Sequence, residues 1–149
     1  MKSFVTVLVL GVLIVGGFYL YKNSSKTSGT DDMAQKGTDT SDLIVVDALA
    51  SGTVILSPLA ISGKARGKWY FEGSFPVSIV DDQGTLLGQG IATAQGEWMT
   101  ENFVPFAGSI TFTVPASDMT NGKVIFHKDN PSGLPENDDA LIIPVQFAK

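Results

Sequence analysis

Residues 71–98 have the pattern of a single β-hairpin with an aromatic residue near each end. Residues 75–79 alternate large apolar side chains with proline and serine, which is the period of a half-buried strand. The Asp-Asp-Gln-Gly segment at residues 81–84 favours a tight turn, because glycine tolerates the positive φ that such turns need. Gly88 and Gly90 interrupt the returning strand where a bulge would fit. The stretch therefore predicts antiparallel β-structure.

Short apolar segments separated by turn residues continue on both sides of this hairpin. The Asn-Gly pair at residues 121–122 is a strong hairpin dipeptide, and no window shows the period of an amphipathic helix. This pattern predicts an all-β fold, an antiparallel β-sandwich of seven or eight strands. Outside the hairpin, the expected strands lie at residues 43–48, 53–56, 59–62, 103–106, 110–114, 123–127 and 141–147.

Several short motifs occur in a set order between residues 43 and 147. They are Ser57-Pro58-Leu59-x-Ile61-x-Gly63-x-Ala65, Phe71-Glu72-Gly73, Asp82-x-Gly84, Lys123-Val124-Ile125-Phe126 and Ile143-Pro144-Val145. In this order they resemble the bacterial spore-germination immunoglobulin-like domain family. The resemblance implies an immunoglobulin-like β-sandwich in an exported or surface-anchored bacterial protein. The chain differs from the family pattern after Phe126, where it has a longer, proline-containing loop at residues 127–137.

The N-terminal segment has the composition of a membrane span. Residues 3–21 carry no charged side chain, and as a helix they would extend roughly 28 Å, about the thickness of the hydrocarbon core of a bilayer. We therefore predict an N-terminal transmembrane anchor at residues 1–21. A cleaved signal peptide and a buried soluble helix are the alternatives. The length of the run and its bulky Phe-Tyr-Leu-Tyr-Lys end argue against cleavage.

Residues 22–41 are polar and nearly free of large apolar side chains, so they cannot bury enough surface to offset their ordering entropy. They predict a flexible linker, roughly 25 Å long on average, before a folded domain at residues 42–149. Positive charges at Lys2, Lys22 and Lys26 are nearly balanced across the predicted span. The short N-terminal stub and the long folded part favour a single-pass protein of the cell membrane, with its C-terminal domain extracytoplasmic.

Charge and composition exclude several classes of function. Residues 42–149 contain six basic and twelve acidic residues, so a nucleic-acid backbone would be repelled. The chain has no cysteine, which removes disulfides, thiolate catalysis and cysteine-ligated zinc. His127 is the only histidine, so a serine–histidine–aspartate triad has one possible base, and no serine stands in a nucleophile-elbow motif. The aspartate pairs at residues 81–82 and 138–139 lack the alternating spacing of an EF-hand loop. We expect no enzyme activity, no cofactor and no metal site.

One concentrated basic and aromatic cluster stands out in this acidic domain. It consists of Lys64, Arg66, Lys68, Trp69 and Tyr70. The cations could meet anionic headgroups, a phosphate-bearing wall polymer or an acidic partner, and the aromatic rings could stack on a sugar or pack at an interface. The alternative is a solvated loop between strands with one aromatic side chain folded onto the core. The cluster is the candidate partner-binding surface.

The sequence thus favours a non-enzymatic, membrane-anchored immunoglobulin-like module on the outer face of a bacterial membrane. Its expected role is protein–protein or envelope interaction, with the membrane contacted through the N-terminal helix. The alternative is a carbohydrate-binding or cell-wall-polymer-binding module. Exposure of Trp69, Tyr70 or Trp98 together on one face would favour that alternative.

Overall fold

β-Strands make up most of the regular structure in this computed structural model, which describes residues 40–114 and 120–148. The described residues also contain three short 3-10 helices, η1 (Thr40–Asp42), η2 (Gly67–Trp69) and η3 (Pro135–Asn137). The strands are β1 (Ile44–Val46), β2 (Thr53–Ile55), β3 (Leu59–Arg66), β4 (Ser74–Asp81), β5 (Leu86–Ala94), β6 (Phe103–Ile110), β7 (Asn121–His127) and β8 (Ala140–Phe147).

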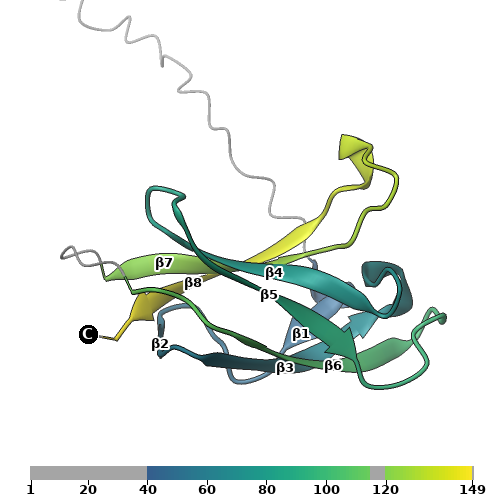
Figure 1. Cartoon of the computed structure of the whole chain (residues 1–149). Helices are drawn as coiled ribbons and strands as arrows, with labels where there is room; N and C mark the ends of the chain where they lie inside the picture. The colour runs from purple at the N-terminus through teal and green to yellow at the C-terminus, as the bar shows by residue number, and fades with distance from the viewer. Residues whose placement is uncertain (1–39, 115–119, 149) are drawn as a thin grey trace, which may run out of the picture. The chain divides into compact units, whose positions relative to one another are not determined.

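The eight described strands form one sheet that curls back on itself, in the order β1-β3-β6-β5-β4-β7-β8-β2. Figure 1 shows β4, β7 and β8 in one layer, facing β1, β3 and β6 in the other. β5 connects the layers, because it pairs with β4 along its length and with β6 through Thr93 and Ala94. β5, β4, β7 and β8 thus lie side by side in one layer and β1, β3 and β6 in the other, with β2 as an eighth strand beside β8, which is the two-layered arrangement of a β-sandwich. The prediction of an all-β, immunoglobulin-like fold is confirmed.

One strand pair corrects the expectation of a purely antiparallel sandwich. β2 runs parallel to β8, with residues 53–55 opposite residues 145–147. Between β1 and β2 the chain bends through Ala48 and Gly52, which have φ values of 55° and 83°. Because the segment keeps its direction while it crosses between the layers, it meets β8 running the same way. The sheet is therefore mixed, with a short strand at each edge.

The Asn-Gly pair at residues 121–122 was expected to form a turn, and this prediction is wrong. Both residues belong to β7, and Gly122 lies opposite Val145 of β8. A Cβ atom at Gly122 would overlap the ring of Phe147 and the carbonyl oxygen of Val80. Glycine stands here because the strand passes close to an aromatic ring, not because the chain turns. The strand expected at residues 110–114 is likewise absent beyond Ile110, where β6 ends.

The predicted hairpin is confirmed as β4 and β5, including its bulge. Ile79 lies opposite Gly88 and Val80 lies opposite Leu86, so Leu87 is the additional residue. A Cβ atom at Gly88 would overlap the backbone next to Phe112, so this glycine also permits a close approach between segments.

The turn between these strands is closed by Asp81. Its Oδ1 accepts hydrogen bonds from the backbone N–H of Gln83 at 2.9 Å and of Thr85 at 2.8 Å. Gly84 has a φ of 82°, as the turn chemistry predicts. Burial by itself would raise the pKa of Asp81, but the hydrogen bonds from Thr85, Gln83 and Gly84 outweigh it and lower the pKa below its ordinary value.

The core between the layers is built around a chain of aromatic rings. Phe75 and Phe106 meet edge to face with centroids 5.0 Å apart, and Phe106 lies 6.2 Å from Phe126. Trp69 and Tyr70 extend this chain on the other side of Phe75, at 6.5 and 5.3 Å. Such contacts add to the stabilisation that burial of the rings provides.

A second tight turn places a non-glycine residue in the left-handed region. Phe71 and Ser74 exchange both backbone hydrogen bonds, at 3.0 and 3.1 Å, around Glu72 and Gly73. Glu72 has a φ of 51° and Gly73 a φ of 76°, which defines a type I′ turn. Left-handed backbone is unfavourable for glutamate, and Asn-Gly is the preferred pair for this turn type.

We therefore expect Glu72→Asn to raise the free energy of unfolding by about 0.5–1 kcal/mol. Chemical denaturation of the full chain would measure the change. Glu97→Asn is the matched control, because Glu97 is exposed and its φ is not positive. An equal gain in both variants would show that the turn geometry is not the cause.

The described residues include no helix that is long and apolar enough to cross a membrane. The predicted anchor at residues 1–21 and most of the predicted linker at residues 22–41 lie outside the described residues.

Candidate functional site

Lys64 and Arg66 lie on β3, at the outer surface of the β1-β3-β6 layer. Lys68 lies on η2, between Arg66 on one side and the β7–β8 loop residues Lys128 and Asp138 on the other. The Nζ atom of Lys64 lies 5.3 Å from the centroid of the Phe103 ring, and the Cζ atom of Arg66 lies 4.1 Å from it. Arg66 also donates from Nε to the carbonyl oxygen of Asp42 at 3.0 Å and from Nη1 to that of Glu101 at 3.2 Å. The guanidinium thus joins three segments of the fold, while Lys64 stays exposed.

The two aromatic residues of the cluster are in the core, not on the surface. Trp69 is 0% exposed and Tyr70 is 4% exposed. The hydroxyl of Tyr70 donates a hydrogen bond to the carbonyl oxygen of Val104 at 2.7 Å. Burial raises the pKa of Tyr70 to about 12, and a hydrogen bond with the backbone of Ala65 acts in the opposite direction. The structure therefore does not place Trp69 and Tyr70 beside the lysines on a face that a sugar could contact.

The alternation of side chains along β3 is a sequence pattern that indicates the burial of Trp69. Ile61, Gly63 and Ala65 face the core, and the same parity continues to Gly67 and Trp69. Trp98, the third aromatic residue named for a carbohydrate face, is half-buried and packs against the core.

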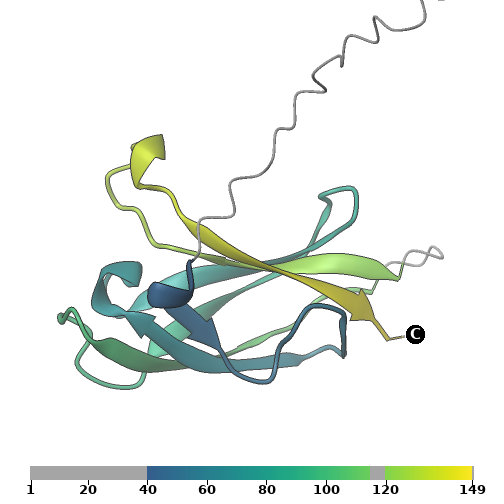
Figure 2. The same ribbon diagram turned by 180° about the vertical axis from the view of Figure 1, so that it is seen from behind.

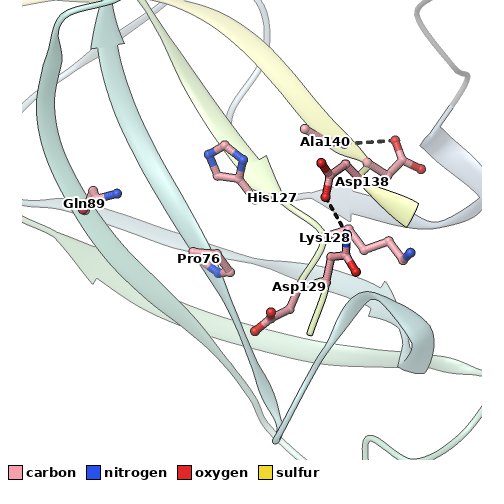
Figure 3. Close-up of a pocket in the computed structure, with 9 residues that line it drawn as sticks. Pro76, Gln89, His127, Lys128, Asp129, Asp138 and Ala140 are labelled. Carbon is pink, nitrogen blue, oxygen red and sulfur yellow. Dashed lines mark hydrogen bonds between the residues drawn. The ribbon is translucent and has the colours of Figure 1, made fainter. Parts of the chain in front are cut away.

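The β7–β8 loop projects from the opposite layer (Figures 1 and 2). A hollow lies beside this loop. It has a volume of about 700 Å³. Pro76 and Gln89 form its floor on the sheet, and the two arms of the loop form its wall (Figure 3). The wall consists of His127, Lys128, Asp129, Asn130, Asp138, Asp139 and Ala140.

The loop wall is held by hydrogen bonds between its own polar groups. The Nδ2 atom of Asn130 donates to the carbonyl oxygen of Leu134 at 2.8 Å and to Oδ1 of Asp138 at 2.7 Å. Nδ2 of Asn137 donates to Oγ of Ser132 at 3.0 Å. Nζ of Lys128 donates to the carbonyl oxygen of Asn137 at 2.8 Å. These bonds tie the two arms together, so the wall has a defined shape.

His127 and Ser78 form the one contact at the hollow that has the chemistry of a catalytic pair. Ser78 Oγ and His127 Nε2 are 2.6 Å apart. Ser78 is only 5% exposed, so a substrate carbonyl could not approach its Oγ. The pair therefore joins β4 to the end of β7. Sequence reasoning missed Ser78, because only the β4–β7 pairing brings it to His127.

The environment of His127 favours the neutral imidazole. Burial lowers the pKa of His127 below its ordinary value of 6.5, while the charge of Asp138 acts in the opposite direction. As the pH falls, the imidazole of the unfolded chain is therefore protonated at a higher pH than the imidazole of the folded domain. The contribution of His127 to stability is complete above about pH 6.5 and is lost as the pH falls toward the folded pKa.

We expect an NMR titration of the single histidine to give a pKa below 6.5, and stability to fall as the pH drops below about 6.5 toward this folded pKa. His127→Gln should remove this component from the pH dependence of unfolding. A titration midpoint at or above 6.5 would contradict the burial argument.

Within residues 40–114 and 120–148, no group of three or more histidine or acidic side chains is arranged so that it could hold a metal ion.

The chain matches a protein-family model. Residues 43–133 match the model of the immunoglobulin-like domain of bacterial spore germination (Gmad2). The match covers β1 to β7 and ends inside the β7–β8 loop, so it is shorter than the resemblance expected from residues 43–147. Neither the curated proteins nor the solved structures gave a match. Domains of this type are generally non-catalytic binding modules. Because more than half of the chain matches, the protein belongs to the family of immunoglobulin-like domains of bacterial spore germination.

Proposed function

We propose that this protein is a membrane-anchored binding module that displays its immunoglobulin-like domain on the outer face of a bacterial membrane. There it binds another protein of the envelope. The observation that carries this function is the outer surface of the layer formed by β5, β4, β7 and β8, which exposes large apolar side chains. Contiguous apolar surface on a folded domain marks interaction sites.

This apolar surface results from the alternation of inward-facing and outward-facing side chains along the strands. On β4, Phe75, Val77 and Ile79 face the core, so the residues between them face outward. On the neighbouring strands the same alternation leaves Ile91 59% exposed and Ile142 45% exposed. Together with the half-buried Ile125 they lie on one face of the layer, so they are not scattered singly.

Membrane attachment is supported by the uncharged run at residues 3–21, and the polar residues 22–41 would let the domain move relative to its anchor. Export of the domain is consistent with its family. Protease treatment of intact cells tests this placement. The domain is expected to be digested from outside while a short membrane-protected fragment survives, and a fully protected domain would refute it.

The second candidate function is binding of an anionic cell-wall polymer or carbohydrate by Lys64, Arg66 and Lys68. It is favoured by the position of Lys64 and Arg66 over the same Phe103 ring, which gathers positive charge on an otherwise acidic domain. Trp69 and Tyr70 would support such a site only from the core, by fixing η2 beneath it.

Cross-linking of the tethered full chain in living cells, followed by identification of its partners, tests the leading function. A reproducible protein partner is expected. The variant Lys64→Ala should keep this partner, because the side chain of Lys64 is exposed on the outer surface of the β1-β3-β6 layer. Loss of binding to purified cell envelope in this variant would favour the polymer instead.

A further inference from the structure

We propose that the hollow and the adjoining sheet surface bind a polypeptide segment of the partner that is both basic and apolar. The inference rests on the proposed function and names the site and the class of partner. We call this surface the docking face and define it by Pro76, Ile91, Ile125 and Ile142 together with the hollow.

The apolar part of the docking face crosses all four strands of its layer. Pro76 of β4 lies opposite Ile91 of β5. Ile125 of β7 lies opposite Ser78 of β4 on one side and opposite Ile142 of β8 on the other. Because residues opposite each other in a sheet share one face, Pro76 and Ile91 lie on the same outer face as Ile125 and Ile142, with Ser78 and His127 of that face between the two pairs. Pro76 and His127 also line the hollow. Apolar side chains of a partner would be removed from water on this outer face.

The charged part of the docking face is negative. Asp129, Asp138 and Asp139 line the hollow (Figure 3). Two cations lie nearby: Lys128, whose Nζ donates to the carbonyl oxygen of Asn137, and Lys68 of η2, which lies beside Asp138 and Asp139. His127 does not offset these carboxylates at neutral pH, because its environment favours the neutral ring. Complementary charge on a partner is therefore positive, and a domain with twelve acidic and six basic residues after residue 41 would attract such a segment from a distance.

The loop wall is organised before any partner arrives. Asn130 bonds to both Leu134 and Asp138, so the carboxylate of Asp138 is held in place across the loop. Binding to a preformed surface costs less conformational entropy than binding to one that must first be ordered. The β7–β8 loop, where the chain is longer than the family pattern, thus supplies the charge of the docking face.

Three synthetic peptides of about ten residues test the proposal: alternating lysine and valine, alternating glutamate and valine, and alternating lysine and serine. The full chain, kept in solution with a mild neutral detergent, is passed over each immobilised peptide. Only the lysine–valine peptide is expected to bind, and more weakly as salt is raised. Equal binding of the lysine–serine peptide would overturn the apolar contribution, and equal binding of the glutamate–valine peptide would overturn the charge contribution. Binding of none would overturn the proposal.

Variants of the chain locate the contact. Ile91→Ser with Ile142→Ser, and separately Asp129→Asn with Asp138→Asn, are each expected to weaken binding by about tenfold or more. Both pairs change exposed or isosteric groups, and circular dichroism and thermal unfolding check that they fold. Val45→Ser with Asp82→Asn is the matched control, on the opposite layer and at the far end of β4, and should bind as the parent does. Equal loss in the control would refute the docking face.

The outcomes also separate this inference from the proposed function. If variants that no longer bind the lysine–valine peptide still cross-link to the cellular partner, the proposed binding function is upheld and the docking face is wrong. If the full chain gives no partner and the domain is protected from external protease, the proposed function itself fails.

Discussion

Replacing Phe106 by alanine is expected to lower the free energy of unfolding by about 3–5 kcal/mol. Phe106 lies in the middle of the core, between Phe75 at 5.0 Å and Phe126 at 6.2 Å. Gly63 on the neighbouring strand makes room for this ring, since a Cβ atom there would lie 2.7 Å from Cζ of Phe106. Deleting the ring removes its contacts with both layers, and the paired strands cannot collapse to fill the cavity. A domain of this size has a total stability of about 5–15 kcal/mol, so the variant would be close to unfolding at physiological temperature.

Guanidinium denaturation of the full chain, followed through tryptophan fluorescence, measures this loss. Phe71→Ala is the matched control because Phe71 is 40% exposed. It should cost less than about 2 kcal/mol, since less apolar area is returned to water. If both variants lost the same stability, the aromatic chain would not be the centre of the core.

Gly67→Ala is expected to destabilise the domain by about 3 kcal/mol, at the upper end of the range for overpacking. A Cβ atom at Gly67 would overlap the carbonyl oxygens of Trp98 and Thr100. Both are backbone atoms, so no side-chain rotation can make space. The hydrogen bond from Arg66 to Glu101 holds the same segment against η2, and moving it away would break that bond.

Gly96→Ala provides the comparison for this glycine. No atom lies within 4 Å of a Cβ built at Gly96, so the change should be neutral or slightly stabilising through the entropy of the unfolded chain. Thermal unfolding of the two variants side by side measures the difference. A neutral Gly67→Ala would show that the loop at residues 98–100 can move away without cost.

The predicted strands were recoverable from the sequence because their signals are local. The alternation at residues 75–79 and the turn residues at 81–84 depend only on the two faces of a strand and on the φ values that a turn needs. These signals gave the β4–β5 hairpin with its bulge. The Asn-Gly pair at residues 121–122 misled the same reasoning, because a glycine required by the ring of Phe147 looks identical to a turn glycine.

The candidate site was predicted less well than the fold. Lys64 and Arg66 lie over the same Phe103 ring, but the sequence could not show that Arg66 donates its hydrogen bonds to the backbone of Asp42 and Glu101. The hollow was missed entirely. Its floor comes from β4 and β5 and its wall from the β7–β8 loop, and no sequence spacing connects them.

The sequence by itself determined that the chain forms short strands with one buried face, because side-chain alternation is a property of neighbouring residues. Only the tertiary structure decided which strands lie side by side. Hydrogen-bond register across the sheet turned β2 parallel to β8, brought Ser78 to His127, and put Ile91, Ile125 and Ile142 on one surface. These arrangements depend on contacts between residues far apart in the chain, and both the core and the docking face arise from them.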